Sequence, residues 1–133
     1  MARRTHNNKK VDWQDATDIK SRIEHLIINL DLEWLKPEDI YCVRSENSNA
    51  NAYARIWGMS RIWQQVLGIR AAYCIEVLSE KFDHLPKHKQ DEVLMHELAH
   101  IPKNFSGALV AHNHSKGGFQ DKLEEMKKSY KRL

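Results

Sequence analysis

Cysteine, proline and glycine are scarce in this sequence, and their scarcity excludes several classes of protein. Among 133 residues there are two cysteines, three prolines and five glycines. Neither Cys42 nor Cys74 belongs to a Cys-x-x-Cys pair, so neither a disulfide framework nor a cysteine-ligated zinc is expected. Both lie in strand-like runs, where a free cysteine packs as a small apolar residue. We therefore predict two reduced core thiols in a cytoplasmic protein.

The sequence also lacks a long hydrophobic run and a strong excess of one charge. No run approaches the ~18 apolar residues of a membrane helix, and no apolar segment follows the basic N-terminus to make a secretory signal. Lys and Arg outnumber Asp and Glu by 21 to 18, and much of the excess lies in ARRTHNNKK and KKSYKRL. We expect a basic flexible tail over residues 1–11 and no membrane contact. A contact with nucleic acid is the alternative role for the basic ends.

The sequence does contain enough apolar material for a folded domain, with 41% hydrophobic and 29% charged residues, and we assign residues 12–133 to a single domain. Apolar residues at helical spacing predict a helix from about Asp15, and Phe119 opens a final amphipathic helix. The other expected elements are strands at 40–44, 52–57 and 71–78, a short helix capped by Ser60, and a helix from Pro86 to about His100. This order indicates an α+β fold.

Two histidines four residues apart lie at the end of the helix expected to start at Pro86. Such side chains share one helix face, so His96 and His100 can bind one Zn²⁺ at ~2.0–2.1 Å from each nitrogen. Glu97 projects to the adjacent surface, from where its carboxylate can reach a water without replacing it as a ligand. This is the physical content of the HExxH pattern, in which the carboxylate is the general base of metal-assisted hydrolysis. Pro102 should end the helix within a residue or so and let the chain return with a third ligand.

A catalytic zinc site usually takes three protein ligands and a water, and the sequence offers several third ligands. His112 is the first choice and His114 the second, because the loop that carries them can turn back toward the helix end. A carboxylate from the last helix, Glu124 or Glu125, is the third choice. If His112 and His114 both bound the ion, the site would be closed and structural.

Three features occur together in the second half of the chain: a strand of the YxIEV type, the run HELxHIP, and FSG followed by a histidine five residues after the glycine. With these features the chain resembles a metallopeptidase family of archaea and phages, a zincin-like group related to the SprT-like proteases, over about residues 15–118. The resemblance implies that His96 and His100 are metal ligands, that Glu97 is catalytic, and that His112 completes the site. Because HNHSKGGF departs from the family's shorter histidine–glycine pattern, His114 stays the alternative.

The motif and the resemblance together predict a minimal zincin-like domain, in which a short, mostly antiparallel sheet packs against the N-terminal helix and the HExxH helix. The predicted function is hydrolysis of peptide or protein substrates by zinc-activated water with Glu97 as general base. The alternatives are a non-catalytic, zinc-stabilised interaction module and a DNA-associated SprT-like protease. We further expect strand 71–78 at the sheet edge, where an extended peptide could pair with it; the alternative is a strand buried within the sheet. We also expect Glu76 exposed on that strand and the four tryptophans in the core.

Overall fold

The computed structural model describes residues 9–133, so most of the expected basic tail lies outside the described residues. The elements in chain order are β1 (Asp12–Asp15), α1 (Thr17–Asn29), the 3₁₀ helix η1 (Pro37–Asp39), β2 (Ile40–Glu46), β3 (Ala54–Trp57), α2 (Arg61–Leu67), β4 (Tyr73–Leu78), α3 (Ser79–Phe82), α4 (Lys87–Ala99) and α5 (Phe119–Lys131). The strands form one sheet in the order β1-β2-β4-β3. The β1–β2 and β3–β4 pairs are antiparallel and the β2–β4 pair is parallel. The predicted α+β fold with a mostly antiparallel sheet is confirmed.

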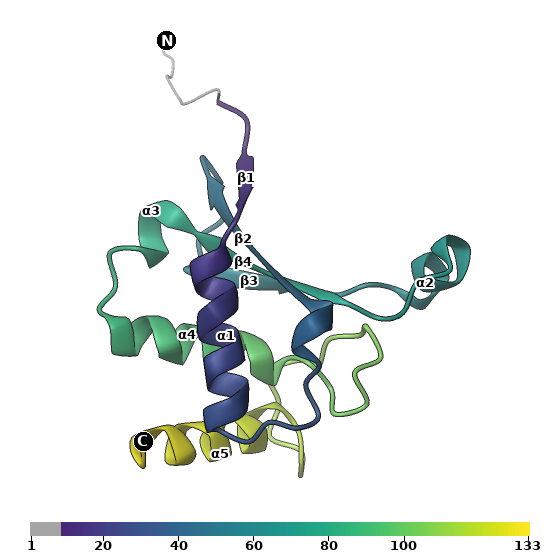
Figure 1. The fold of residues 1–133 in the computed structure, drawn as a ribbon, viewed down its shortest axis with the longest axis vertical. Helices are drawn as coiled ribbons and strands as arrows, with labels where there is room; N and C mark the ends of the chain where they lie inside the picture. The colour runs from purple at the N-terminus through teal and green to yellow at the C-terminus, as the bar shows by residue number, and fades with distance from the viewer. Residues whose placement is uncertain (1–8) are drawn as a thin grey trace.

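The hydrophobic core lies between one face of the sheet and the helices (Figure 1). Side chains alternate between the two faces of a strand, and the core face of β2 and β4 carries Cys42, Ile75 and Val77. The same core includes Ile19 and Ile23 of α1 and Leu94 and Leu98 of α4. Full burial of such a side chain stabilises a fold by ~1.5–3 kcal/mol. The apolar contacts therefore hold α4, which carries the HExxH motif, firmly in the body of the protein.

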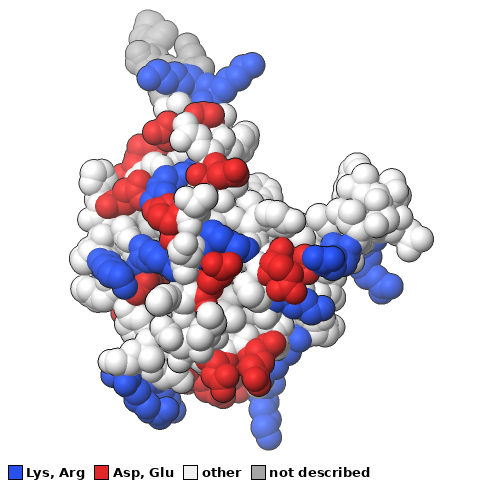
Figure 2. All heavy atoms as spheres, in the orientation of Figure 1, with Lys and Arg blue, Asp and Glu red and all other residues white. Residues whose placement is uncertain are grey.

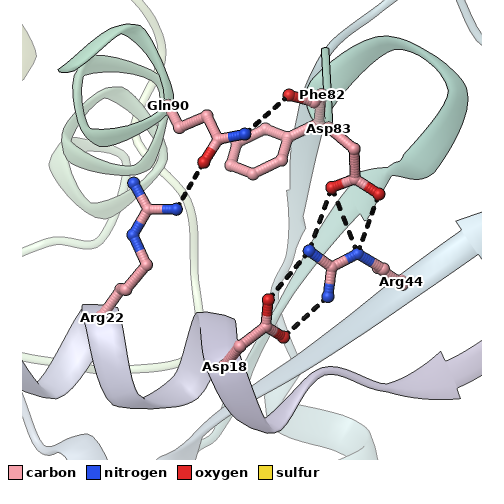
Figure 3. Close-up of polar contacts among 6 residues, drawn as sticks. All are labelled: Asp18, Arg22, Arg44, Phe82, Asp83 and Gln90. Carbon is pink, nitrogen blue, oxygen red and sulfur yellow. Dashed lines mark hydrogen bonds and ion pairs between the residues drawn. The ribbon is translucent and has the colours of Figure 1, made fainter. Parts of the chain in front are cut away.

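Polar contacts among α1, β2, the end of α3 and the start of α4 also help to position α4 (Figure 3). Arg44 of β2 makes paired contacts with Asp18 of α1, at 2.7 and 2.9 Å, and also bonds Asp83, which follows α3. Arg22 of α1 donates to Gln90 of α4 at 2.5 Å. Each partly exposed pair is worth at most ~1 kcal/mol. Their effect is to link α1, the sheet and the start of α4 into one network.

Strand β4 lies inside the sheet, so the expectation that segment 71–78 forms an edge is wrong. It pairs with β2 on one side and with β3 on the other, and the open edges belong to β1 and β3. Ile75 and Glu76, on opposite faces of the strand, are both fully buried, as in a strand covered on both faces. The sequence alone did not predict the strand Asp12–Asp15, the short helix α3, or the crossing of β3 to the far side of β4.

Glu76 of β4 is fully buried, which corrects the expectation that it is exposed. Its carboxylate accepts hydrogen bonds from Arg55 Nε at 2.8 Å, Trp57 Nε1 at 2.8 Å and Trp13 Nε1 at 3.3 Å. Burial favours the neutral acid, yet the hydrogen bonds from Arg55 and Trp57 and the Arg55 charge hold the pKa of Glu76 down at about 2. Trp13 and Trp57 lie with Glu76 on the face of the sheet away from the core, and both are half exposed. Trp63, on α2, is half exposed as well. The expectation of four core tryptophans is therefore wrong for these three.

Helix α2 projects from the body beside the sheet (Figure 1) and buries none of its residues. Ser60 is its N-cap residue but makes no capping hydrogen bond with its side chain; Gly68 ends the helix in the left-handed region, with φ of 66°. Gln64 ties the helix to the body by donating to the carbonyls of Met59 and Ser106, each at 2.9 Å. Figure 2 shows this projection as largely uncharged, while acidic and basic side chains are interspersed over the body. Within residues 9–133, no helix has both the length and the apolar character to cross a bilayer.

Candidate metal centre

Helix α4 ends where its sequence requires and places two imidazoles side by side. Pro86 is its N-cap residue and His100 its C-cap residue, and Pro102 prevents continuation because it has no N–H to donate. The rings of His96 and His100 are 5.2 Å apart between centroids, as expected for one helical turn. Leu94 and Leu98 lie on the opposite side of the helix and are buried. The predicted pairing of the two motif histidines is therefore present.

The loop after α4 is attached to the body at two points before it reaches the histidines. The Tyr73 hydroxyl of β4 accepts a hydrogen bond from Gly107 N at 2.7 Å and donates one to Ala108 O at 2.8 Å. Gly107 has a φ of +96°, and a Cβ there would lie 2.3 Å from Met59 O. Only glycine tolerates both the backbone conformation and the close approach. Gly107 thus lets the loop pack against the segment leading to α2.

The loop returns His112, rather than His114, to the end of α4. His112 Nε2 lies 3.0 Å from His96 Nε2, and the His112 ring lies 4.6 Å from that of His100. One ligand atom from each of the three residues falls within 4.8 Å of the others. Among residues 9–133 this is the only group of three or more His, Cys, Asp or Glu side chains that could hold a metal ion. His114, although two residues away, is exposed and outside the group.

The carboxylates considered as third ligands lie outside this group as well. Glu124 and Glu125 are exposed on α5. Asp121 accepts a hydrogen bond from Gly117 N at 2.7 Å and so supports the turn that precedes α5. Of the third-ligand candidates, His112 is the one that lies in the group with His96 and His100.

The donor set suits a divalent cation that binds imidazole. Burial, with the neighbouring charges of His100, His112 and Lys127, lowers the pKa of His96 to about 4, and burial also lowers the pKa of His100. Both rings are therefore neutral near pH 7, which is the form that coordinates metals. Two nitrogens each ~2.05 Å from a tetrahedral ion are about 3.3 Å apart. The 3.0 Å separation of His96 and His112 requires only a small adjustment to reach that value.

A second contact orients the His100 ring. Its Nδ1 lies 2.7 Å from Val110 O, and Val110 N in turn donates to His100 O at 2.8 Å. A carbonyl can only accept, so Nδ1 carries the proton and Nε2 keeps its lone pair. Metal-binding histidines commonly hold their second nitrogen in this way. The same two contacts place the loop backbone next to the helix end just before His112.

Helix α5 forms the apolar wall of the site, a role that the sequence did not reveal. Phe119 is fully buried, and its ring lies 5.0, 4.6 and 4.7 Å from the rings of His96, His100 and His112. Lys122 donates to Ile101 O at 2.6 Å and so ties α5 to the residue after His100. In the sequence Phe119 is only the first apolar residue of an amphipathic helix. Its position directly after the glycine pair that ends the histidine loop is the one local signal.

Glu97 follows His96 in α4 and is largely buried. It is 7% exposed, and burial raises its pKa to about 7. A carboxyl group with a pKa near neutrality can both accept and return a proton at physiological pH. Glu97 and His96 also line a cavity of about 540 Å³ that lies along α4. A water or substrate in that cavity can therefore reach both side chains.

A family model described as "Putative phage metallopeptidase" matches residues 11–128 of the chain. The match includes the sheet, the motif helix, the histidine loop and most of α5. No curated protein and no solved structure matches the chain significantly.

Proposed function

The chain belongs to the putative phage metallopeptidase family, and from that premise we propose that it is a zinc peptidase in which His96, His100 and His112 hold the metal. Membership of this family supports a function as a metal-dependent hydrolase that acts on peptides or proteins. The observation that carries the assignment of residues is the convergence of three imidazoles at the end of the helix that also carries a buried carboxylate. Three protein ligands leave one coordination position for water or substrate, as catalytic zinc requires.

Zinc bound there supplies Lewis-acid polarisation of the peptide carbonyl and lowers the pKa of its water toward ~7. Glu97 takes a proton from the attacking water as the oxygen bonds to the carbonyl carbon. Glu97 then passes that proton to the amide nitrogen as the carbon–nitrogen bond breaks. The Val110 carbonyl keeps His100 in one tautomer, and the Phe119 ring packs against all three imidazoles. Proton transfer is thus assigned to one side chain with a pKa near 7.

The test is a Glu97→Gln variant with Glu125→Gln, an exposed residue of α5, as the matched control. Peptide hydrolysis is followed by mass spectrometry and bound metal by elemental analysis. We expect Glu97→Gln to keep its zinc and to lose about 10²–10⁴-fold in rate, and Glu125→Gln to match wild type. A Glu97→Gln variant that keeps both zinc and activity would refute the assignment. Zinc binding by a wild type that hydrolyses no peptide would instead favour a zinc-stabilised interaction module.

The identity and coordination of the metal are tested by anomalous scattering at the zinc edge. We expect three protein ligands and one water. Four protein ligands, with His114 as the fourth, would indicate a closed structural site.

The proposal places the enzyme in a reducing compartment such as the cytoplasm. Cys42 and Cys74 are free thiols, and burial raises the pKa of both, which keeps them protonated and unreactive. On the face shown in Figure 2, acidic and basic side chains are interspersed. The alternative, a DNA-associated protease, is tested by measuring whether the protein binds DNA with a strongly salt-dependent affinity.

A further inference from the structure

The cavity beside the candidate metal centre runs along α4, with β3 on one side and α5 on the other. Its volume is about 540 Å³, within the range of sites that enclose a ligand group. Tyr53 and Ala54 come from the β3 side, and Leu123 and Lys127 come from α5. We call this cavity the α4 groove. Because His96 and Glu97 line it too, a group bound in the groove lies next to the reacting atoms.

The walls of the α4 groove are largely apolar. Tyr53, Leu85, Val93 and Leu123 contribute them, and Tyr53 is half exposed. An alkyl or aromatic group that enters loses its contact with water, and so do the side chains that it covers. A lone polar group would lose water there without gaining a partner. The lining therefore selects for a large apolar side chain.

The charged residues of the groove differ in how they are paired. Lys89 and Glu92 form an ion pair at 3.6 Å and largely compensate each other. Within residues 9–133, no carboxylate pairs with Lys127, which shares the groove with His96. Its ammonium group is therefore available to a carboxylate of a bound ligand. An exposed ion pair between Lys127 and a ligand carboxylate would contribute less to the binding free energy than the apolar walls of the groove.

We propose that the α4 groove is the substrate subsite next to the scissile bond and that it takes a large aliphatic or aromatic side chain whose peptide carries a carboxylate close by, at Lys127. This inference rests on the proposed peptidase function and adds the substrate class. The apolar side chain lies against Val93 and Tyr53, and the carboxylate is either an acidic side chain or the free C-terminus. Small residues and basic neighbours are disfavoured.

The first measurement separates this inference from the proposed function. Zinc-loaded wild type is incubated with a proteome-derived peptide mixture, and the cleaved positions are read by mass spectrometry. We expect Leu, Phe and similar residues next to the cleaved bond to exceed Ala by at least ~10-fold. Acidic residues nearby should exceed Lys and Arg by about 2–5-fold. Cleavage without a preference for large apolar residues would overturn the subsite but leave the peptidase intact. Failure to cleave any peptide would count against the peptidase itself.

Binding provides a readout that does not depend on turnover. Zinc-loaded Glu97→Gln is titrated with peptides that differ only by Leu or Ala at the preferred position, followed by calorimetry. A second pair differs by Asp or Lys at the neighbouring position. Lys127→Glu in the same background should reverse the Asp preference. Lys128→Glu, an exposed neighbour on α5 that does not line the groove, should leave it unchanged. Equal effects of the two substitutions would refute the role of Lys127.

The apolar part is tested by changing the size of the groove. Val93→Phe fills it and should shift the preference from Leu and Phe toward Ala, with zinc content unchanged. Circular dichroism and thermal unfolding check that the variant folds. Tyr53→Ala provides the second test, because Tyr53 is half exposed and its loss does not threaten the core. It should weaken binding of the Leu peptide by about 3–10-fold and leave the Ala peptide unchanged. Unchanged selectivity in both variants would show that the substrate side chain binds elsewhere.

Discussion

The choice of third ligand leads to a prediction in which two neighbouring histidines have opposite outcomes. His112→Ala removes one of the three imidazoles that converge within 4.8 Å, whereas His114→Ala alters an exposed side chain outside that group. Neither side chain is part of the hydrophobic core. Without metal, both variants should therefore unfold close to the wild-type temperature. Differences should emerge only when zinc is added.

The size of the difference follows from the linkage between binding and stability. Free zinc at 100 times the wild-type Kd stabilises the wild type by about 2.7 kcal/mol. Loss of an outer hydrogen-bond partner of a metal ligand already costs up to ~100-fold in affinity, so loss of a ligand should cost at least that. At the same zinc concentration, zinc then stabilises His112→Ala by only about 0.4 kcal/mol, which is about 2.3 kcal/mol less than it stabilises the wild type. At about 3–5 °C per kcal/mol for a chain of this length, the zinc-dependent rise in Tm should be smaller by about 7–12 °C.

The assay is thermal unfolding by circular dichroism, with and without zinc, after the wild-type Kd has been measured by competition with a chelator. His114→Ala should show the full wild-type rise in Tm. If His114→Ala loses the rise and His112→Ala keeps it, the assignment of the third ligand is wrong. Equal losses in both variants would indicate a four-ligand structural site.

Three further predictions concern the residues that support the site. The pKa of Glu76 lies at about 2, below its ordinary value of 4.5, so its contribution is present above pH 4.5 and is lost as the pH falls toward 2. Urea unfolding across that pH window should show that the free energy of unfolding falls by roughly 2–3 kcal/mol more in the wild type than in Glu76→Gln. If the two proteins lost stability in parallel, the pairing of the Glu76 carboxylate would be contradicted. Tyr73→Phe leaves the N–H of Gly107 without its acceptor, so it should lower the free energy of unfolding by ~1–3 kcal/mol. It should also weaken zinc binding, measured by chelator competition. An unchanged zinc affinity would show that Tyr73 does not position the loop. Gly107→Ala should lower the Tm more than Gly117→Ala, because both have positive φ but only the first Cβ would meet a backbone atom, Met59 O; equal shifts would exclude that contact as the cause.

Local sequence was a good guide wherever one helix carries the information. The four-residue spacing of His96 and His100, and the proline after them, predict where α4 ends and which side chains share its face. The helical spacing of Ile19 and Ile23 likewise predicts the buried side of α1. These features depend on contacts within a few residues, which is why they can be read without a structure.

Longer-range features were harder to predict, and the errors have a common cause. Segment 71–78 reads equally well as an edge or an inner strand until its partners are known, and only the pairing with β2 and β3 places it inside. Glu76 reads as exposed until Arg55 and Trp57 of β3 are brought over it. Those same contacts hold Trp57 on the face of the sheet opposite the core. Each error concerns which segments meet across the sheet.

The sequence by itself determined the α+β order of elements, the helix with its paired histidines and the adjacent glutamate, because these follow from spacing along the chain. Tertiary structure alone decided that His112 rather than His114 returns to α4, that Phe119 forms the wall behind the rings, and that a groove joins β3 to α5 beside Glu97. The physical reason is that a loop can carry either histidine to many places. Which one arrives is decided by the contacts at Tyr73, Gly107 and Val110, residues that meet only when the chain has folded.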